Sequence, residues 1–212
     1  MAIAAGQALA KLQATPARLP GPAYRFFKRL FDLGCSILML AIFGMPMLVI
    51  AAAIRLTSKG PALFWSDRVG RENQIFRMPK FRSMRIEAPQ LATHLFRDPA
   101  NYLTPIGGLL RRTSLDELPQ LLSILKGDIS FVGPRPALFN QDDLVAMRTE
   151  RGVHRLIPGL TGWAQINGRD SISIPVKVDL DTYYLEHFSF WFDLKILCLT
   201  VLRVMKTEDI SH

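Results

Sequence analysis

The residues of this 212-residue sequence best suited to chemistry are two adjacent acidic side chains, Asp116 and Glu117. They directly precede an apolar run, so they stand at the expected start of a helix. Backbone amides at such a position face outward and favour an anion. A carboxylate there can hold Mg²⁺ while phosphate oxygens fill the remaining coordination positions. The pair therefore points to phosphate chemistry.

The same residues also fit a purely structural role. Ser114 and Glu117 have the spacing of a capping box, in which a serine and a glutamate close the first turn of a helix. Pro119 weakens this interpretation, because it cannot donate a hydrogen bond to the Leu115 carbonyl. We expect a helix over residues 115–125 that ends at the Lys-Gly pair following it. Sequence alone leaves capping and catalysis both open.

Several cations accompany the acidic pair. Arg135 stands between two prolines, which restrict the backbone on both sides and so aim the guanidinium. A guanidinium can bind phosphate oxygens through two parallel hydrogen bonds. The alternative is a rigid turn with an incidental arginine. Arg111 lies just upstream of the pair, and Lys80 and Arg82 follow a predicted hairpin.

Residues 158–169 form a loop rich in glycine and amide side chains, including Gln165, Asn167 and Arg169. Such a loop can hold a nucleotide or a sugar. As a bare pattern it is only a polar loop.

A membrane segment is indicated near the N-terminus. Residues 33–54 carry no charge over 22 positions, which is long enough for a membrane helix. Pro46 interrupts this run, and basic residues flank it on both sides, which argues that both ends stay on the cytoplasmic side. A re-entrant helix broken at Pro46 and a spanning helix remain open alternatives. We divide the chain into a lead-in (1–23), the membrane helix (24–58), a catalytic domain (59–206) and a tail (207–212).

The remaining pattern predicts an α+β fold that is mainly helical. Residues 62–66 and 74–77 predict a small β-hairpin around a turn at 68–73. Thr104 and Pro105 have the composition of a helix start, with the threonine as cap. Further helices are expected over residues 142–151 and 188–206. The latter is too charged to span a membrane, and it can either pack in the core or lie as an amphipathic helix in the interface.

Charge is unevenly distributed along the chain. The net charge is +8, and residues 1–85 hold 13 Lys and Arg against 3 Asp and Glu. This half suits an anionic partner such as lipid head groups, nucleic acid or a phosphorylated small molecule. A solvated basic face is the alternative. Nucleic-acid binding would leave the apolar segment without a purpose, and no recognition motif supports it.

Taken together, these stretches resemble the bacterial sugar transferase family, the monotopic polyprenol-phosphate phosphoglycosyl transferases, in its minimal catalytic form. The resemblance runs over residues 25–206 in family order. Two positions depart from it: Ile157 replaces a frequent arginine, and Met45 replaces a frequent serine before the membrane proline. The matching blocks are residues 28–33 (KRLFDL), 80–84 (KFRSM), 115–120 (LDELPQ), 126–136 (KGDISFVGPRP) and 158–169 (PGLTGWAQINGR).

This resemblance implies a monotopic enzyme on the cytoplasmic face of the bacterial inner membrane. It implies that Asp116 attacks the β-phosphate of a UDP-sugar and contacts Mg²⁺, with Glu117 as its partner. UMP would leave, and polyprenol phosphate would take the phosphosugar. Membrane lipid is an expected partner, nucleic acid is not, and a homo-oligomer is possible. The residues expected to bind substrate are Lys80, Arg82, Arg111, Arg135, Gln165, Asn167 and Arg169.

One non-enzymatic alternative remains. A peripheral membrane adaptor could bind anionic lipid through its basic half, with Asp116 and Glu117 serving only as a helix cap.

Overall fold

The longest element of the computed structural model is an N-terminal helix, α2 (Pro22–Thr57). The structure describes residues 19–88, 99–168 and 172–206. Within these, α2 is the helix that is long and apolar enough to cross a membrane by length and composition. Its 36 residues make it about 54 Å long at about 1.5 Å per residue. It begins with a proline, which suits the first turn of a helix, and so starts slightly earlier than expected.

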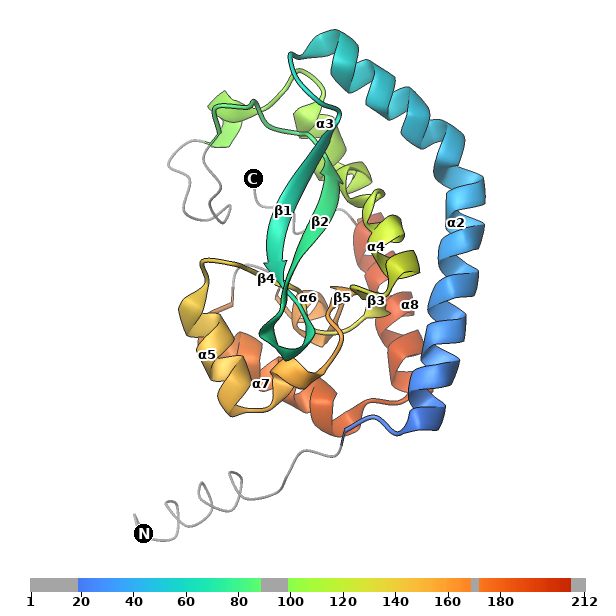
Figure 1. Ribbon diagram of the computed structural model, residues 1–212, viewed down its shortest axis with the longest axis vertical. Coiled ribbons are helices and arrows are strands. Elements are labelled where there is room, and N and C mark those ends of the chain that lie inside the picture. The colour runs from blue at the N-terminus through green and yellow to red at the C-terminus, as the bar shows by residue number, and fades with distance from the viewer. Residues whose placement is uncertain (1–18, 89–98, 169–171, 207–212) are drawn as a thin grey trace, which may run out of the picture.

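Pro46 bends α2 without ending it. Helical structure continues on both sides of this residue, and Figure 1 shows the helix axis changing direction midway along its length. A proline removes its own N–H donor and crowds one earlier carbonyl, and the usual result in a long helix is a kink. The break expected at Pro46 is therefore a bend.

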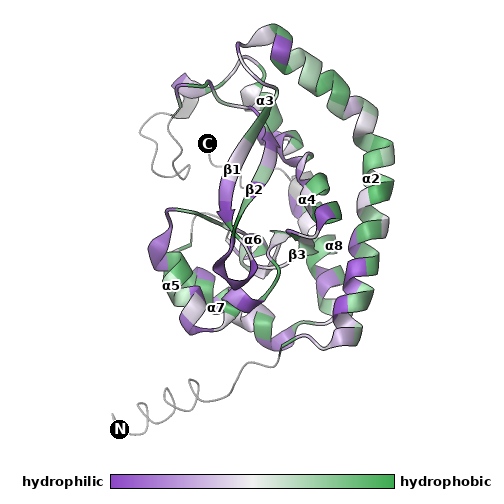
Figure 2. Ribbon diagram, in the orientation of Figure 1, coloured by the Kyte–Doolittle hydropathy of each residue, from purple (hydrophilic) through white to green (hydrophobic). Residues whose placement is uncertain are grey.

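The outward face of α2 is an exposed apolar surface. Figure 2 shows apolar residues along most of the helix and hydrophilic residues near both ends. An apolar surface of this extent on a folded protein marks a site of interaction. Together with the length of α2, it indicates that the protein associates with a membrane. The residues of this face, each at least 58% exposed, are Ile37, Leu38, Ile42, Met45, Leu48, Val49 and Leu56.

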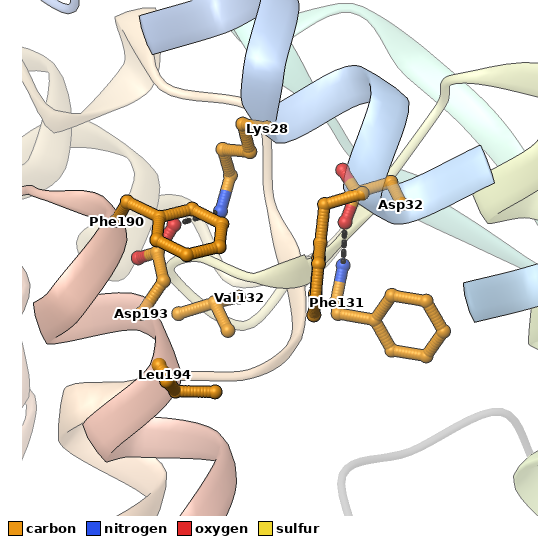
Figure 3. Close-up of a pocket in the computed structure, with 8 residues that line it drawn as sticks. Lys28, Asp32, Phe131, Val132, Phe190, Asp193 and Leu194 are labelled. Atoms are coloured by element: carbon orange, nitrogen blue, oxygen red, sulfur yellow. Dashed lines mark hydrogen bonds and ion pairs between the residues drawn. The ribbon is translucent and has the colours of Figure 1, made fainter. Parts of the chain in front are cut away.

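The N-terminal half of α2 is fastened to the rest of the molecule by polar contacts. The Lys28 ammonium lies 2.5 Å from the Asp193 carboxylate, and one Asp32 oxygen accepts a hydrogen bond from the Phe131 amide at 3.1 Å. Figure 3 shows both contacts around a small pocket lined mainly by apolar side chains. Two charged side chains of α2, Lys28 and Asp32, thus have polar partners in the folded body.

Arg29 connects α2 to a second helix, α4 (Gln120–Lys126). Its guanidinium donates to the carbonyls of Ile124 and Leu125, the latter at 2.6 Å. These two carbonyls lie in the last turn of α4, where carbonyls lack the regular helix partner four residues on, although the Gly127 amide also donates to the Ile124 carbonyl at 3.1 Å. Gly127 ends α4 in the left-handed conformation, with φ of +97°, as the Lys-Gly pair predicts.

The C-terminal half of α2 packs into a separate apolar cluster. Ile54 is fully buried there against Phe81 and Leu110. Both halves of the helix therefore contact the same folded body, and in Figure 1 α4 and α8 (Phe190–Lys206) lie between α2 and the rest of the molecule.

The predicted hairpin is present with longer strands. Strand β1 (Leu63–Val69) pairs antiparallel with β2 (Ile75–Phe81) through a short turn. A two-residue strand, β4 (Ala137–Leu138), extends this sheet on the other edge of β1. A second sheet consists of two short parallel strands, β3 (Ser130–Val132) and β5 (Gly159–Thr161).

The other helices confirm a mainly helical α+β fold. The expected helix at 142–151 is present, and the helix expected over 188–206 begins two residues later. A helix that the sequence interpretation did not anticipate, α7, follows Ser173 with a proline in its first turn. The elements not yet introduced are α3 (Gly107–Arg112), α5 (Asp142–Glu150), α6 (Trp163–Ile166) and α7 (Ile174–His187).

Two expected helix starts are wrong. Thr104 does not cap a helix, because α3 begins three residues later, after Ile106. The Thr104 hydroxyl instead donates to the Ser83 carbonyl at 3.3 Å and so joins the chain after β2 to the start of α3. The helix expected from Leu115 is divided into a short 3₁₀ turn and α4, since Pro119 stands at the boundary.

The contact between α2 and α4 yields a stability prediction. Replacing Arg29 with methionine keeps much of the side-chain bulk but removes two charge-assisted hydrogen bonds to carbonyls. We expect the free energy of unfolding to fall by about 1.5–3 kcal/mol, measured by denaturant unfolding in detergent. Arg25→Met is the matched control, because Arg25 lies exposed on the same helix. Equal losses in the two variants would contradict this assignment.

Candidate active site

Asp116 and Glu117 lie in a 3₁₀ turn, Leu115–Glu117, between α3 and α4. Ser114 precedes the turn in the left-handed conformation, with φ of +56°, and its side chain makes no capping hydrogen bond. The first residues of α4 are likewise uncapped by a side chain. The capping box is therefore wrong as an account of these residues, and the acidic pair is available for another role.

Glu117 is held between two cations from distant regions of the chain. Its Oε1 accepts from Lys80 Nζ at 2.8 Å and from Arg135 Nη2 at 3.0 Å. Lys80 belongs to β2, and Arg135 lies in the loop after β3. The Glu117 side chain is only 17% exposed, so water screens these contacts weakly. Two cations predicted to bind substrate thus converge on one carboxylate.

These contacts fix the charge of Glu117. Burial by itself raises the pKa of this carboxyl, but the charges and hydrogen bonds of Lys80 and Arg135 outweigh burial and hold the pKa well below its usual range. Glu117 is therefore held as an anion at neutral pH. It keeps both cations gathered beside Asp116.

Asp116 has the opposite environment. The residue is 8% exposed, and its carboxylate accepts no hydrogen bond from the residues that the structure describes. Burial raises its pKa, and the charge of Glu117 adds to that effect, while Lys80, Arg111 and Arg135 partly oppose it. A carboxylate that is poorly solvated and free of hydrogen bonds is a better nucleophile than one that is fully paired. Two neighbouring carboxylates thus have pKa values shifted in opposite directions.

The loop that carries Arg135 is packed backbone against backbone on the loop at 158–162. The Gly133 amide donates to the Thr161 carbonyl, and the Gly159 amide donates to the Pro134 carbonyl, both at 2.9 Å. A Cβ on Gly159 would lie 2.0 Å from the Gly133 nitrogen, and one on Gly162 would lie 2.1 Å from the Gly133 oxygen. Glycine is needed at these positions because the two chains approach so closely.

This packing changes the interpretation of the polar loop. Gln165 donates to the Leu160 carbonyl at 3.1 Å, and Asn167 donates to the Trp163 carbonyl at 2.8 Å. Both side chains bind their own segment in the structure. The buried Gln165 Oε1 has no hydrogen-bond partner among the described residues. Arg169 lies outside the described residues, so the substrate contacts of all three remain predictions.

The two other predicted cations are placed differently from each other. Arg111, in the last turn of α3, lies close enough to lower the pKa of Asp116. Arg82 is buried, and its guanidinium donates to the Lys59 carbonyl and to both the carbonyl and the hydroxyl of Ser58. Arg82 therefore fixes the chain just after the end of α2. To contact substrate, its guanidinium would have to break the hydrogen bonds to Ser58 and Lys59.

One functional candidate was missed by the sequence interpretation. Arg148, near the C-terminal end of α5, donates to the Arg135 carbonyl at 2.8 Å and pairs with Asp181 in α7. The two residues of the pair are 33 positions apart, and neither lies in a motif. The one sequence signal for this contact would have been that Arg148 falls on the face of α5 that is buried.

The site suits a magnesium ion that is held partly by the protein and partly by substrate. No group of three or more His, Cys, Asp or Glu side chains that could enclose a metal occurs among the described residues. Mg²⁺, however, is commonly held by one or two protein carboxylates together with substrate phosphates and water. Asp116, with no hydrogen bond to it from described residues, provides such a carboxylate.

Comparison with known proteins gives a family match over nearly the whole chain. Residues 23–207 match the family model described as bacterial sugar transferase. The chain is 45% identical over 187 residues to a Bacillus subtilis protein named as the uncharacterized sugar transferase EpsL, covering 87% of this chain and 90% of that protein.

Two further relatives carry names that state an activity. A UDP-glucose:undecaprenyl-phosphate glucose-1-phosphate transferase of Caulobacter vibrioides is 38% identical, with 90% of this chain and 74% of that protein covered. A UDP-N-acetylgalactosamine-undecaprenyl-phosphate N-acetylgalactosaminephosphotransferase of Aeromonas hydrophila is 35% identical over 88% of this chain. The chain spans 45% of the length of the Aeromonas protein.

The contrast between the two carboxylates predicts stability changes of opposite sign. A carboxyl whose pKa is raised by folding destabilises the folded protein above its unfolded pKa of about 4. Asp116→Asn should therefore raise the melting temperature at pH 7, with the difference shrinking as pH falls toward about 4. Thermal unfolding in detergent over a pH series measures this.

Glu117→Gln is the matched control. The pKa of Glu117 is lowered by folding, so its carboxylate stabilises the protein above the unfolded pKa. This variant should melt at a lower temperature than the wild type at pH 7. A drop of similar size in both variants would refute the contrast.

Proposed function

Because this chain belongs to the bacterial sugar transferase family, we propose that it moves a phosphosugar from a UDP-sugar to polyprenol phosphate. The products are polyprenol-diphosphate-sugar and UMP, as in a first membrane step of glycoconjugate assembly. The names of the Caulobacter and Aeromonas relatives support a UDP-sugar donor and an undecaprenyl-phosphate acceptor. The observation that carries the proposal is the pairing of a cation-bound Glu117 with a buried Asp116 that no described residue hydrogen-bonds.

The reaction proceeds in two displacements at one phosphorus. In the first, an Asp116 oxygen forms a bond to the β-phosphorus of the donor. The bond from that phosphorus to the bridging oxygen breaks, and UMP leaves with the electron pair. In the second, a phosphate oxygen of polyprenol phosphate attacks the same phosphorus, and Asp116 leaves as a carboxylate. Each displacement makes one bond and breaks one.

The residues around Asp116 supply positive charge for both displacements. Lys80 and Arg135, gathered by Glu117, lie where they can also neutralise donor phosphate oxygens. Arg111 contributes charge from the end of α3. Asp116 would hold Mg²⁺ together with phosphate oxygens and water, and the bound ion would supply further positive charge to the site.

The geometry of the acidic pair does not favour the alternative of a non-enzymatic membrane adaptor. It requires Asp116 and Glu117 to serve as a helix cap, whereas Ser114 makes no capping bond and the acidic pair precedes α4. A lipid-binding adaptor also has no need to bury an aspartate that no described residue hydrogen-bonds, since such burial costs stability.

We place the enzyme on the cytoplasmic face of the bacterial inner membrane, with α2 entering and leaving on that side. Lys28 and Arg29 fasten one half of α2 to the catalytic body, and Ile54 of the other half is buried against it. A helix that crossed the bilayer in this arrangement would carry the polar body into hydrocarbon, at a large cost. The exposed outward face of α2 suits a helix that lies partly within one leaflet.

Trapping the intermediate tests the mechanism. Incubation with UDP-glucose, UDP-galactose or UDP-N-acetylgalactosamine, without polyprenol phosphate, should add the mass of one phosphosugar to the intact protein and release one UMP. EDTA should prevent the addition and Mg²⁺ should restore it, because the diphosphate needs charge neutralisation. Two-substrate kinetics should be ping-pong.

Two variants sharpen this experiment. Asp116→Asn should form no adduct, whereas Ser114→Ala should form it normally, because Ser114 contributes no capping bond. UMP release that occurs only when both substrates are present, with no adduct at any donor concentration, would show direct transfer. Full activity in excess chelator would remove the metal from the mechanism.

Thiol labelling tests the membrane topology. Single cysteines at Ala23 and Lys59, two exposed positions near the ends of α2, are introduced in a variant lacking Cys35 and Cys198. An impermeant thiol reagent should label neither position in intact cells and both after permeabilisation. Labelling of one position alone from outside would mean that α2 crosses the membrane.

A further inference from the structure

A buried ion pair joins α5 and α7 behind the active-site loop. Arg148 is 7% exposed and Asp181 is 1% exposed. Arg148 Nε and Nη2 both donate to Asp181 Oδ2, at 3.0 and 2.6 Å. Burying an ion pair costs about as much desolvation energy as the attraction returns, and apolar side chains of similar volume often serve stability equally well. Stability alone is therefore a poor explanation for this pair.

The pair has a third contact that does explain it. Arg148 Nη1, the remaining arm of the same guanidinium, donates to the Arg135 carbonyl at 2.8 Å. Only a planar guanidinium can bind a carboxylate with one edge and a carbonyl with another. Asp181 therefore fixes the orientation in which Arg148 meets the backbone of Arg135.

Hydrogen bonds hold the whole Pro-Arg-Pro loop in the same way. The Pro134 carbonyl accepts from the Gly159 amide at 2.9 Å, and the Pro136 carbonyl accepts from Arg68 Nη1 at 3.3 Å. A pocket lies beside the loop, bordered by Arg135, Arg148 and His154 among others, so side-chain packing does not fill this space. All three consecutive carbonyls of the loop thus accept a hydrogen bond from another segment.

We propose that Arg148, oriented by Asp181, is a positioning residue for phosphosugar transfer. It fixes the Arg135 backbone so that the Arg135 guanidinium reaches Glu117 and lies beside Asp116. Arg148 does not touch the substrate and acts through Arg135. The inference rests on the proposed function, because it assigns Arg135 to the donor phosphates.

A paired replacement separates positioning from stability. Arg148→Met/Asp181→Leu removes both charges together and keeps the volume similar, so the melting temperature should stay close to that of the wild type. The Arg135 carbonyl loses its donor, and kcat/KM for UMP release should fall at least about tenfold, since small misplacement of a phosphate ligand is costly. Arg148→Lys, which keeps the charge beside Asp181 but lacks the second edge, should show the same loss.

A double-mutant cycle with Arg135 distinguishes positioning from a purely structural role, because it tests whether the loss of kcat/KM depends on the Arg135 guanidinium. In an Arg135→Met background the guanidinium is already absent, so adding Arg148→Met/Asp181→Leu should lower kcat/KM by less than about threefold. Losses that multiply fully would show that Arg148 acts independently of Arg135, and would overturn the proposal.

The matched control is a second ion pair near the same helices. Arg151, at the end of α5, lies 3.8 Å from Asp179 of α7, and the two side chains are 51% and 67% exposed. Arg151→Ala/Asp179→Ala should leave kcat/KM unchanged, because this pair makes no contact with the Arg135 loop in the described structure.

The outcomes distinguish this inference from the proposed function. A stable Arg148→Met/Asp181→Leu enzyme with kcat/KM within about twofold of the wild type would overturn the positioning role while leaving the reaction intact. If Arg148→Lys is the only variant that folds, full activity in that variant would also overturn the positioning role. A wild-type protein that releases no UMP from any donor would overturn the proposed function and the positioning role together.

Discussion

The site depends on one constraint: a single oxygen of Glu117 accepts from both Lys80 and Arg135. The three residues come from the hairpin, the turn before α4 and the loop after β3, so their meeting fixes three segments relative to one another. The same contact concentrates positive charge beside a buried carboxylate. A buried Asp116 carboxylate without neighbouring cations would be a costly anion. Lys80 and Arg135 offset part of that cost, although burial still raises the pKa of Asp116.

Much of the architecture follows from local signals in the sequence. The charge-free run predicts α2, the two β-like stretches around the turn at 68–73 predict the hairpin, and the Lys-Gly pair predicts where α4 ends. These features succeed because each depends on residues within about one or two turns of one another. The acidic pair could be located in the same way, but its residues left capping and catalysis both open, and only the family resemblance implied a catalytic role.

The remaining features depend on contacts between distant residues, which no local pattern encodes. Strands β3 and β5 are three residues each, too short for a recognisable alternation, and they pair only because glycines let their backbones approach. Thr104 has the composition of a cap, yet its hydroxyl bonds to Ser83, a partner supplied by the tertiary fold. Arg148 could not be distinguished from a surface arginine until α7 was placed against α5.

The inner face of α2 packs against both apolar clusters of the catalytic body. Cys35, Met39 and Leu40 pack against the main core, and Ile54 completes a second cluster. Deleting α2 would therefore expose both apolar clusters and destabilise the catalytic fold, and would not yield a soluble enzyme. A water-soluble version would have to retain α2 and exchange only its outward apolar residues for polar ones.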